Sequence, residues 1–182
     1  MVPLVHIISV TLAISAISKL RDPMPTRRAL DGIGLWVGPA TVRAYAVGEL
    51  VVAGAAILGN RQAVIGLVML HLGFAIFVAI SMGTSGAGCG CFGVRSTAPP
   101  RTMHLVLNVA SAGVALAAAI VHVGGLAAVI DSGPALVAAH LAVVAVGTSM
   151  LVALYTEGAE VADAVRMMRR QRAGRLIGEA HA

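Results

Sequence analysis

The chain has little charge, few aromatic residues and only two cysteines. Charged residues make up 12% of its 182 residues, against about a quarter in soluble domains, while 58% are apolar and the mean hydropathy is +0.91. This composition excludes a water-soluble domain. The aromatic share of 3%, with no basic patch interleaved with aromatics, excludes a nucleic-acid-binding surface. Two cysteines, Cys89 and Cys91, exclude a disulfide framework and allow at most one bridge within the chain.

Long apolar runs dominate what is present. They cover residues 2–18, 44–58, 63–82, 103–122 and 134–155, and each is close to the roughly 20 residues that cross a bilayer. Positive charges follow the first run instead of preceding it, which favours a mature helix over a cleaved signal peptide. We therefore predict an all-α, polytopic transmembrane helix bundle of about five spans. It divides into a four-helix core with the cysteine loop (1–125), an additional span (126–156) and a basic tail (157–182).

Two further segments are predicted to lie on the membrane surface. Residues 26–37 combine apolar and charged positions and are expected to form a short interfacial helix anchored by Trp36. Residues 157–178 place apolar positions opposite an arginine-rich face and are expected to lie on the anionic inner leaflet. Turns are predicted at Gly124-Gly125 and at 131–134, before the fifth span.

The positions of the basic residues predict the orientation in the membrane. With five crossings, twelve of the 13 lysines and arginines fall on one side, and Arg61 alone falls on the other. Because basic loops stay in the cytoplasm, the amino terminus is predicted outside and the carboxyl terminus inside the plasma membrane. The loop that carries Cys89 and Cys91 is then cytoplasmic.

The motif Cys89-Gly90-Cys91 is the strongest chemical signal. Two cysteines one glycine apart can form a strained disulfide that opens easily, and nearby cations such as Lys19 and Arg101 favour the reactive thiolate. This pattern favours redox chemistry. Two alternatives stay open: inert buried thiols, and a transition-metal site with Cys89, Cys91 and His104 as ligands.

The predicted helix order brings other polar residues to the same side of the membrane. The end of the first span carries Lys19, and the start of the fourth carries Arg101, His104 and Asn108. Glu49 lies inside the apolar zone of the second span, where an unpaired carboxylate is costly. It is expected either to pair with Lys19 or Arg101, or to stay protonated as a proton donor to a leaving thiolate. The mid-span His71 and His140 are predicted to be hydrogen-bonded packing residues.

These residues also carry a family resemblance. Lys19-Leu20-Arg21-Asp22, Glu49-Leu50 and Cys89-Gly-Cys91-Phe-Gly93, with Asn108, resemble the MauE family of methylamine-utilisation membrane proteins, which is related to DoxX-like redox-associated membrane proteins. The resemblance covers about residues 1–125. It implies a thioredoxin-like partner and a role in maturing a disulfide-rich periplasmic client, the small subunit of methylamine dehydrogenase.

The leading interpretation is therefore a membrane protein of thiol–disulfide redox chemistry, a candidate oxidoreductase without a cofactor, with Cys89, Cys91, Glu49, Lys19 and Arg101 as its site. The implied client lies outside, whereas the charge count puts the cysteines inside. Either the pair takes electrons from a cytoplasmic thiol donor, or the true orientation is the inverse. The second interpretation is a non-enzymatic module that binds a transition metal or assembles a larger complex.

Overall fold

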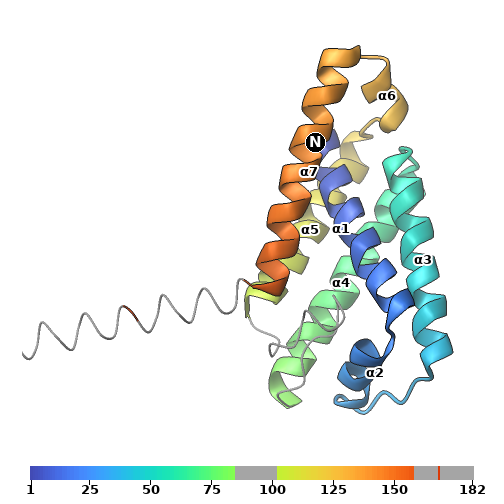
Figure 1. Ribbon diagram of the computed structural model, residues 1–182, viewed down its shortest axis with the longest axis vertical. Helices are drawn as coiled ribbons and strands as arrows, with labels where there is room; N and C mark the ends of the chain where they lie inside the picture. The colour runs from blue at the N-terminus through green and yellow to red at the C-terminus, as the bar shows by residue number, and fades with distance from the viewer. Residues whose placement is uncertain (85–101, 158–167, 169–182) are drawn as a thin grey trace, which may run out of the picture.

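The computed structural model describes residues 1–84, 102–157 and 168, and these form an all-helical bundle (Figure 1). The helices are α1 (Val2–Arg21), α2 (Met24–Asp31), α3 (Pro39–Ile57), α4 (Arg61–Thr84), α5 (Thr102–Val121), α6 (Leu126–Ile130) and α7 (Pro134–Thr156). Five of them, α1, α3, α4, α5 and α7, are long and apolar enough to cross a membrane. The predicted fold class and the five predicted spans are confirmed.

The helices extend beyond the apolar runs at several ends. Helix α3 begins at Pro39, five residues before the predicted start, and α1 continues to Arg21. Proline occupies the first turn of α3 and of α7, where its missing N–H costs nothing and its fixed φ suits a helix. The added residues include Lys19, which is buried, and Arg43, which is exposed and whose long side chain can carry its charge away from the apolar zone. A hydropathy pattern therefore underestimates the length of these helices.

The predicted interfacial helix over 26–37 is shorter than expected and begins earlier, as α2 (Met24–Asp31). A glycine-centred cap ends it: Leu35 N–H donates to Leu30 O, Gly34 N–H donates to Asp31 O, and Gly34 has a φ of 82°. This left-handed conformation suits glycine and turns the chain away from the helix axis. Trp36 lies in the connection that follows and is 85% exposed.

Helix α1 lies at the centre of the bundle. Half of its apolar window is buried (50%), against 11% for α7, which lies at the periphery. Figure 1 shows α1 descending from the N-terminus to the end of the bundle where α2 lies. The first residues of α3 and α5 and the last residues of α4 and α7 lie at this same end. We call it the α2 end.

Small side chains let the helices approach closely. Ala53 and Ala56 of α3 and Ala115 and Ala118 of α5 are buried in the core with Leu12 of α1. Close approach of this kind is how membrane helices gain van der Waals contact without a hydrophobic driving force from water. Small residues therefore form the contacts that both α3 and α5 make in this core.

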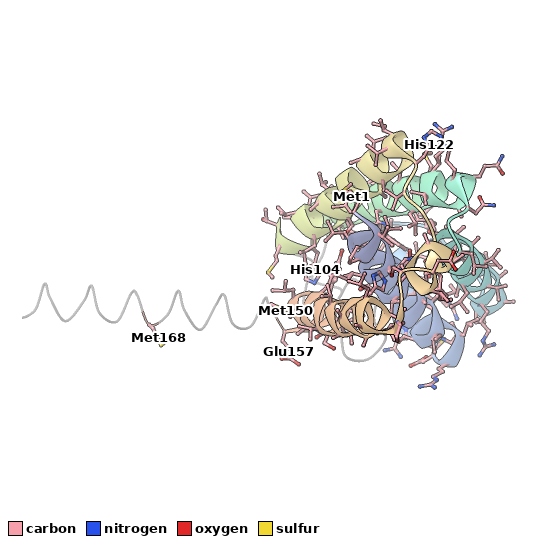
Figure 2. The ribbon with its side chains drawn as sticks, turned by 90° about the horizontal axis from the view of Figure 1, so that it is seen from above. Met1, His104, His122, Met150, Glu157 and Met168 are labelled. Carbon is pink, nitrogen blue, oxygen red and sulfur yellow. The ribbon has the colours of Figure 1, made fainter. Side chains whose placement is uncertain are left out.

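Two polar contacts join α7 to the rest of the bundle. Near one end, His140 Nε2 lies 2.8 Å from His6 Nδ1, and His6 Nε2 lies 3.1 Å from Ile57 O. At the α2 end, His104 Nε2 lies 2.9 Å from Tyr155 O. Figure 2, seen from above, shows His104 on the side of the bundle where α7 ends at Glu157. The prediction that His140 takes part in hydrogen-bonded packing is confirmed, with His6 as its partner.

Candidate functional site

A fully buried ion pair lies between α1 and α3. Lys19 Nζ donates to both carboxylate oxygens of Glu49, at 2.6 and 2.7 Å, and each residue is only 1% exposed. Two short, charge-assisted hydrogen bonds of this kind are strong, and each charge neutralises the other inside the apolar zone. Of the two partners predicted for Glu49, the described residues supply Lys19.

Two aromatic rings complete the surroundings of the ammonium group. Lys19 Nζ lies 4.8 Å from the ring centre of Phe74 on α4 and 5.8 Å from that of Tyr45 on α3. The two rings meet edge to face, with centres 6.4 Å apart. A desolvated cation over aromatic faces gains about 2 kcal/mol or more. Three helices thus hold the charged head of Lys19 in one position.

A small cavity with several polar residues in its lining borders Phe74. Its volume is about 30 Å³, and its polar lining comes from Thr11, Ser15, His71 and Asn108. A polar cavity of this size has room for water. His71 Nδ1 bonds to Leu67 O at 2.9 Å, so Nδ1 carries the proton and Nε2 is left as an acceptor. The hydrogen bond of His71 confirms its predicted packing role, and the cavity adds a polar neighbourhood to it.

A larger apolar cavity also borders Phe74. It measures about 430 Å³ and is bounded by α2, the connection after α2, α3 and α4. Lys19 and Phe74 form part of its lining. The ion pair therefore lies beside an apolar space, and Phe74 lines both this space and the small polar cavity.

The cysteine segment starts from this region of the bundle. Phe74 precedes the end of α4 at Thr84 by ten residues, which is about 15 Å of helix. Cys89 follows Thr84 by five residues, and five extended residues span at most about 17 Å. The described helices therefore fix only the point from which the cysteine segment departs, at Thr84.

The predicted site residues are distributed as follows. Lys19 and Glu49 are brought together, and Asn108 lies on the polar cavity beside Phe74. Cys89, Cys91 and Arg101 lie outside the described residues. His104 is buried, and its Nε2 is engaged by the backbone of α7 at Tyr155. Within the described part of the chain, no group of three or more metal-binding side chains is present.

Sequence reasoning missed the aromatic residues of the site. Phe74 and Tyr45 belong to the few aromatics in the chain, and nothing in the local pattern distinguishes them from lipid-facing side chains. One signal was available: His71 and Phe74 are three residues apart, so both lie on one face of α4. In the structure their rings meet edge to face, with centres 6.3 Å apart.

Comparison with known proteins places this arrangement in a family. No curated protein and no solved structure gives a match. A family model described as methylamine utilisation protein MauE matches residues 3–123, which include the Lys19–Glu49 pair, the cysteine motif and Asn108. The match covers well over half of the chain and ends before α6 and α7. The chain belongs to the MauE family, as the resemblance implied.

Proposed function

We propose that this multi-pass membrane protein carries out thiol–disulfide exchange in methylamine utilisation, with Cys89 and Cys91 as the redox pair. The observation that carries the proposal is the buried Lys19–Glu49 ion pair, which lies at the α2 end of the bundle, where α4 also ends five residues before Cys89 in the sequence. An ammonium group stabilises a nearby thiolate, and a carboxyl group can exchange protons with a thiol. Lys19 and Glu49 therefore support the chemistry that two cysteines one residue apart make available.

The exchange takes place in two steps. The thiolate of one cysteine attacks a disulfide of the partner, a mixed disulfide forms, and one partner sulfur leaves as a thiolate that takes a proton. The second cysteine then attacks the mixed disulfide. This step closes a Cys89–Cys91 disulfide and releases the partner as a dithiol. Two electrons pass from the chain to its partner, and the reverse sequence oxidises the partner.

The proposed partner is a thioredoxin-like protein, and the proposed client is a disulfide-containing periplasmic protein such as the small subunit of methylamine dehydrogenase. Both are expectations that the resemblance to the MauE family implies, and the family match supports the setting of methylamine utilisation. The exchange chemistry supports the partner, because an oxidised thioredoxin-like protein presents a disulfide that a cysteine thiolate can attack, and a reduced one presents a thiolate that can attack a Cys89–Cys91 disulfide.

We also propose a plasma-membrane location with the amino terminus outside. Among the described residues, Lys19, Arg21, Arg27, Arg28 and Arg43 belong to the α2 end of the bundle, and Arg61 begins α4 at the opposite end. Cytoplasmic loops are enriched in such residues, so the α2 end is assigned to the cytoplasm. Labelling of the cysteines with a membrane-impermeant thiol reagent, in intact cells and in inverted vesicles, tests this assignment. Faster labelling in intact cells than in inverted vesicles would show that the orientation is the opposite one.

Single-cysteine variants test the exchange itself. We expect Cys89→Ser and Cys91→Ser each to abolish turnover of an oxidised thioredoxin without loss of membrane insertion. The variant that keeps the attacking cysteine should accumulate a mixed disulfide, because the resolving thiol is missing. The double variant is the matched control, because it should form no mixed disulfide. Full turnover in both single variants would refute the proposal.

A further inference from the structure

Positive charge at the α2 end exceeds what the carboxylates there neutralise. Lys19 and Arg27 each face a carboxylate, at 2.6 and 3.6 Å. Three further basic residues of this end are exposed and form no ion pair within the described part of the chain: Arg21, Arg28 and Arg43. Exposed, unpaired arginines attract anions. The thiol exchange proposed above does not use these side chains.

Two of these arginines come together at the end of α1. Arg21 is the last residue of α1, and Arg43 Nε donates to the carbonyl oxygen of the preceding residue, Leu20, at 3.4 Å. This contact holds the Arg43 side chain of α3 against the end of α1. A guanidinium group presents a planar fork of donors that matches the oxygens of a phosphate. Arg21 and Arg43 therefore present such donors from two neighbouring helices.

Asp22 is the acidic residue next to this pair of arginines. Its Oδ1 accepts a hydrogen bond from the backbone N–H of Met24 at 3.0 Å, and its carboxylate forms no ion pair among the residues that the structure describes. One carboxylate beside two guanidinium groups leaves the end of α1 with a net positive charge. This charge favours an anion over a neutral or cationic ligand.

Both arginines lie at the level of the lipid head groups. Helices α1 and α3 are long and apolar enough to cross a membrane, α1 ends at Arg21, and α3 begins at Pro39, four residues before Arg43 (Figure 1). Basic side chains at the ends of membrane spans extend toward the interface, where the phosphates of the lipids lie. The nearest source of an anion is therefore a phospholipid.

The connection between α2 and α3 favours a lipid surface over a soluble acidic protein. Trp36 is 85% exposed and Leu35 is 53% exposed. Apolar side chains exposed to this degree are unfavourable in water, whereas tryptophan is enriched at the membrane interface and leucine can enter the boundary of the acyl chains. The exposed apolar side chains and the unpaired arginines belong to the same end of the bundle.

We infer that Arg21 and Arg43 bind the phosphate of an anionic phospholipid head group at the end of α1. Arg28 adds to the positive charge that attracts this lipid. A zwitterionic head group carries a positive charge of its own, so that it gains less from the same arginines. The inference goes beyond the proposed thiol exchange, because it requires neither cysteine.

Trp36 provides the reporter for an experiment. It is the single tryptophan of the chain, and it belongs to the same end of the bundle as the two arginines. We propose nanodiscs that hold the full-length protein in equal amounts of phosphatidylglycerol and phosphatidylcholine. One lipid at a time carries bromine atoms in its acyl chains near the head group, and bromine quenches tryptophan at close range. The ratio of the two quenching effects measures which lipid is enriched beside Trp36.

Arginine variants at the two ends of the bundle supply the matched comparison. We expect wild type to favour phosphatidylglycerol by about fivefold or more, and Arg21→Gln/Arg43→Gln to bring the ratio close to one. Arg21→Lys/Arg43→Lys keeps the charge and should keep part of the preference. Arg61→Gln is the control, because Arg61 Nε donates to Ala119 O at the opposite end in the same way, at 3.3 Å. This control should leave the ratio unchanged.

The double variant Cys89→Ser/Cys91→Ser should show the wild-type lipid preference, so that loss of exchange and loss of lipid binding are scored separately. A ratio near one in wild type would overturn the inference and would leave another anion, such as an acidic protein, as the partner of the arginines. An equal preference in wild type and Arg21→Gln/Arg43→Gln would overturn it as well. Loss of the preference in excess inorganic phosphate, at constant ionic strength, would show that the site takes free phosphate instead of a lipid.

Discussion

Removing one partner of the Lys19–Glu49 pair should destabilise the protein far more than removing both. Lys19→Met leaves a buried carboxylate, and Glu49→Met leaves a buried ammonium, each at a position only 1% exposed in the native protein. An orphaned buried charge costs about 3–5 kcal/mol. The double variant places two apolar side chains of similar length in the same space, and such replacements are often neutral or stabilising. We therefore expect the free energy of unfolding of the double variant to lie within about 1 kcal/mol of the wild-type value.

The exposed ion pair on α2 is the internal control. Arg27 Nε lies 3.6 Å from Asp31 Oδ2, four residues along the helix, and the two side chains are 38% and 31% exposed. Pairs of this kind contribute about 0.3–0.5 kcal/mol. Arg27→Met and Asp31→Met should therefore change the free energy of unfolding by less than about 1 kcal/mol each.

Reversible unfolding in mixed micelles, with a rising mole fraction of dodecyl sulfate, measures these free energies. The decisive quantity is the coupling energy, the difference between the effect of the double variant and the sum of the two single effects. We expect a coupling of several kcal/mol for Lys19 and Glu49. Single effects that add within about 0.5 kcal/mol would show that the two charges do not depend on each other, and the reasoning would fail.

Two further predictions concern close contacts between backbones and helices. Gly125→Ala should destabilise the protein by about 3 kcal/mol or more, because a Cβ at Gly125 would overlap the backbone of Leu58 and Gly59. Gly113→Ala is the control, because Gly113 lies on an open face of α5. It should be neutral or slightly stabilising in the same unfolding assay. Gly147→Val should cost about 1–3 kcal/mol, because its side chain would overlap Ile7 on α1. Combining it with Ile7→Ala should recover part of that loss, and no recovery would place the defect elsewhere.

The sequence was sufficient to predict the number and order of the spans. A bilayer forces each crossing to satisfy its own backbone hydrogen bonds, so a long apolar run has little choice but to form a helix. Helix ends were less predictable, since charged side chains can sit in a terminal turn. Lys19 shows the difficulty: it follows the apolar run in sequence, yet in the structure it is fully buried inside α1.

Contacts between distant residues were predictable only where charge demanded a partner. Glu49 needed either a cation or a proton, and the sequence left Lys19 and Arg101 as its candidate partners; the structure shows Lys19. By contrast, His6 and His140 are 134 residues apart, and nothing in either local pattern required them to meet. The same holds for the cavity beside Phe74, because a cavity is a property of packing among several helices. Contacts and cavities of this kind can be found only in a three-dimensional structure.

The energetics of the ion pair help to decide whether its role is structural or functional. If two methionines hold the same space at little cost, stability alone gives no reason for a charged pair at this depth, where each charge needs the other to be tolerated. A purely structural pair would then leave thiol exchange unchanged in the double variant Lys19→Met/Glu49→Met. Folded, inserted protein with lost exchange would instead assign the pair to the chemistry of the cysteines. The double variant thus separates a structural ion pair from a functional one, which neither single variant can do.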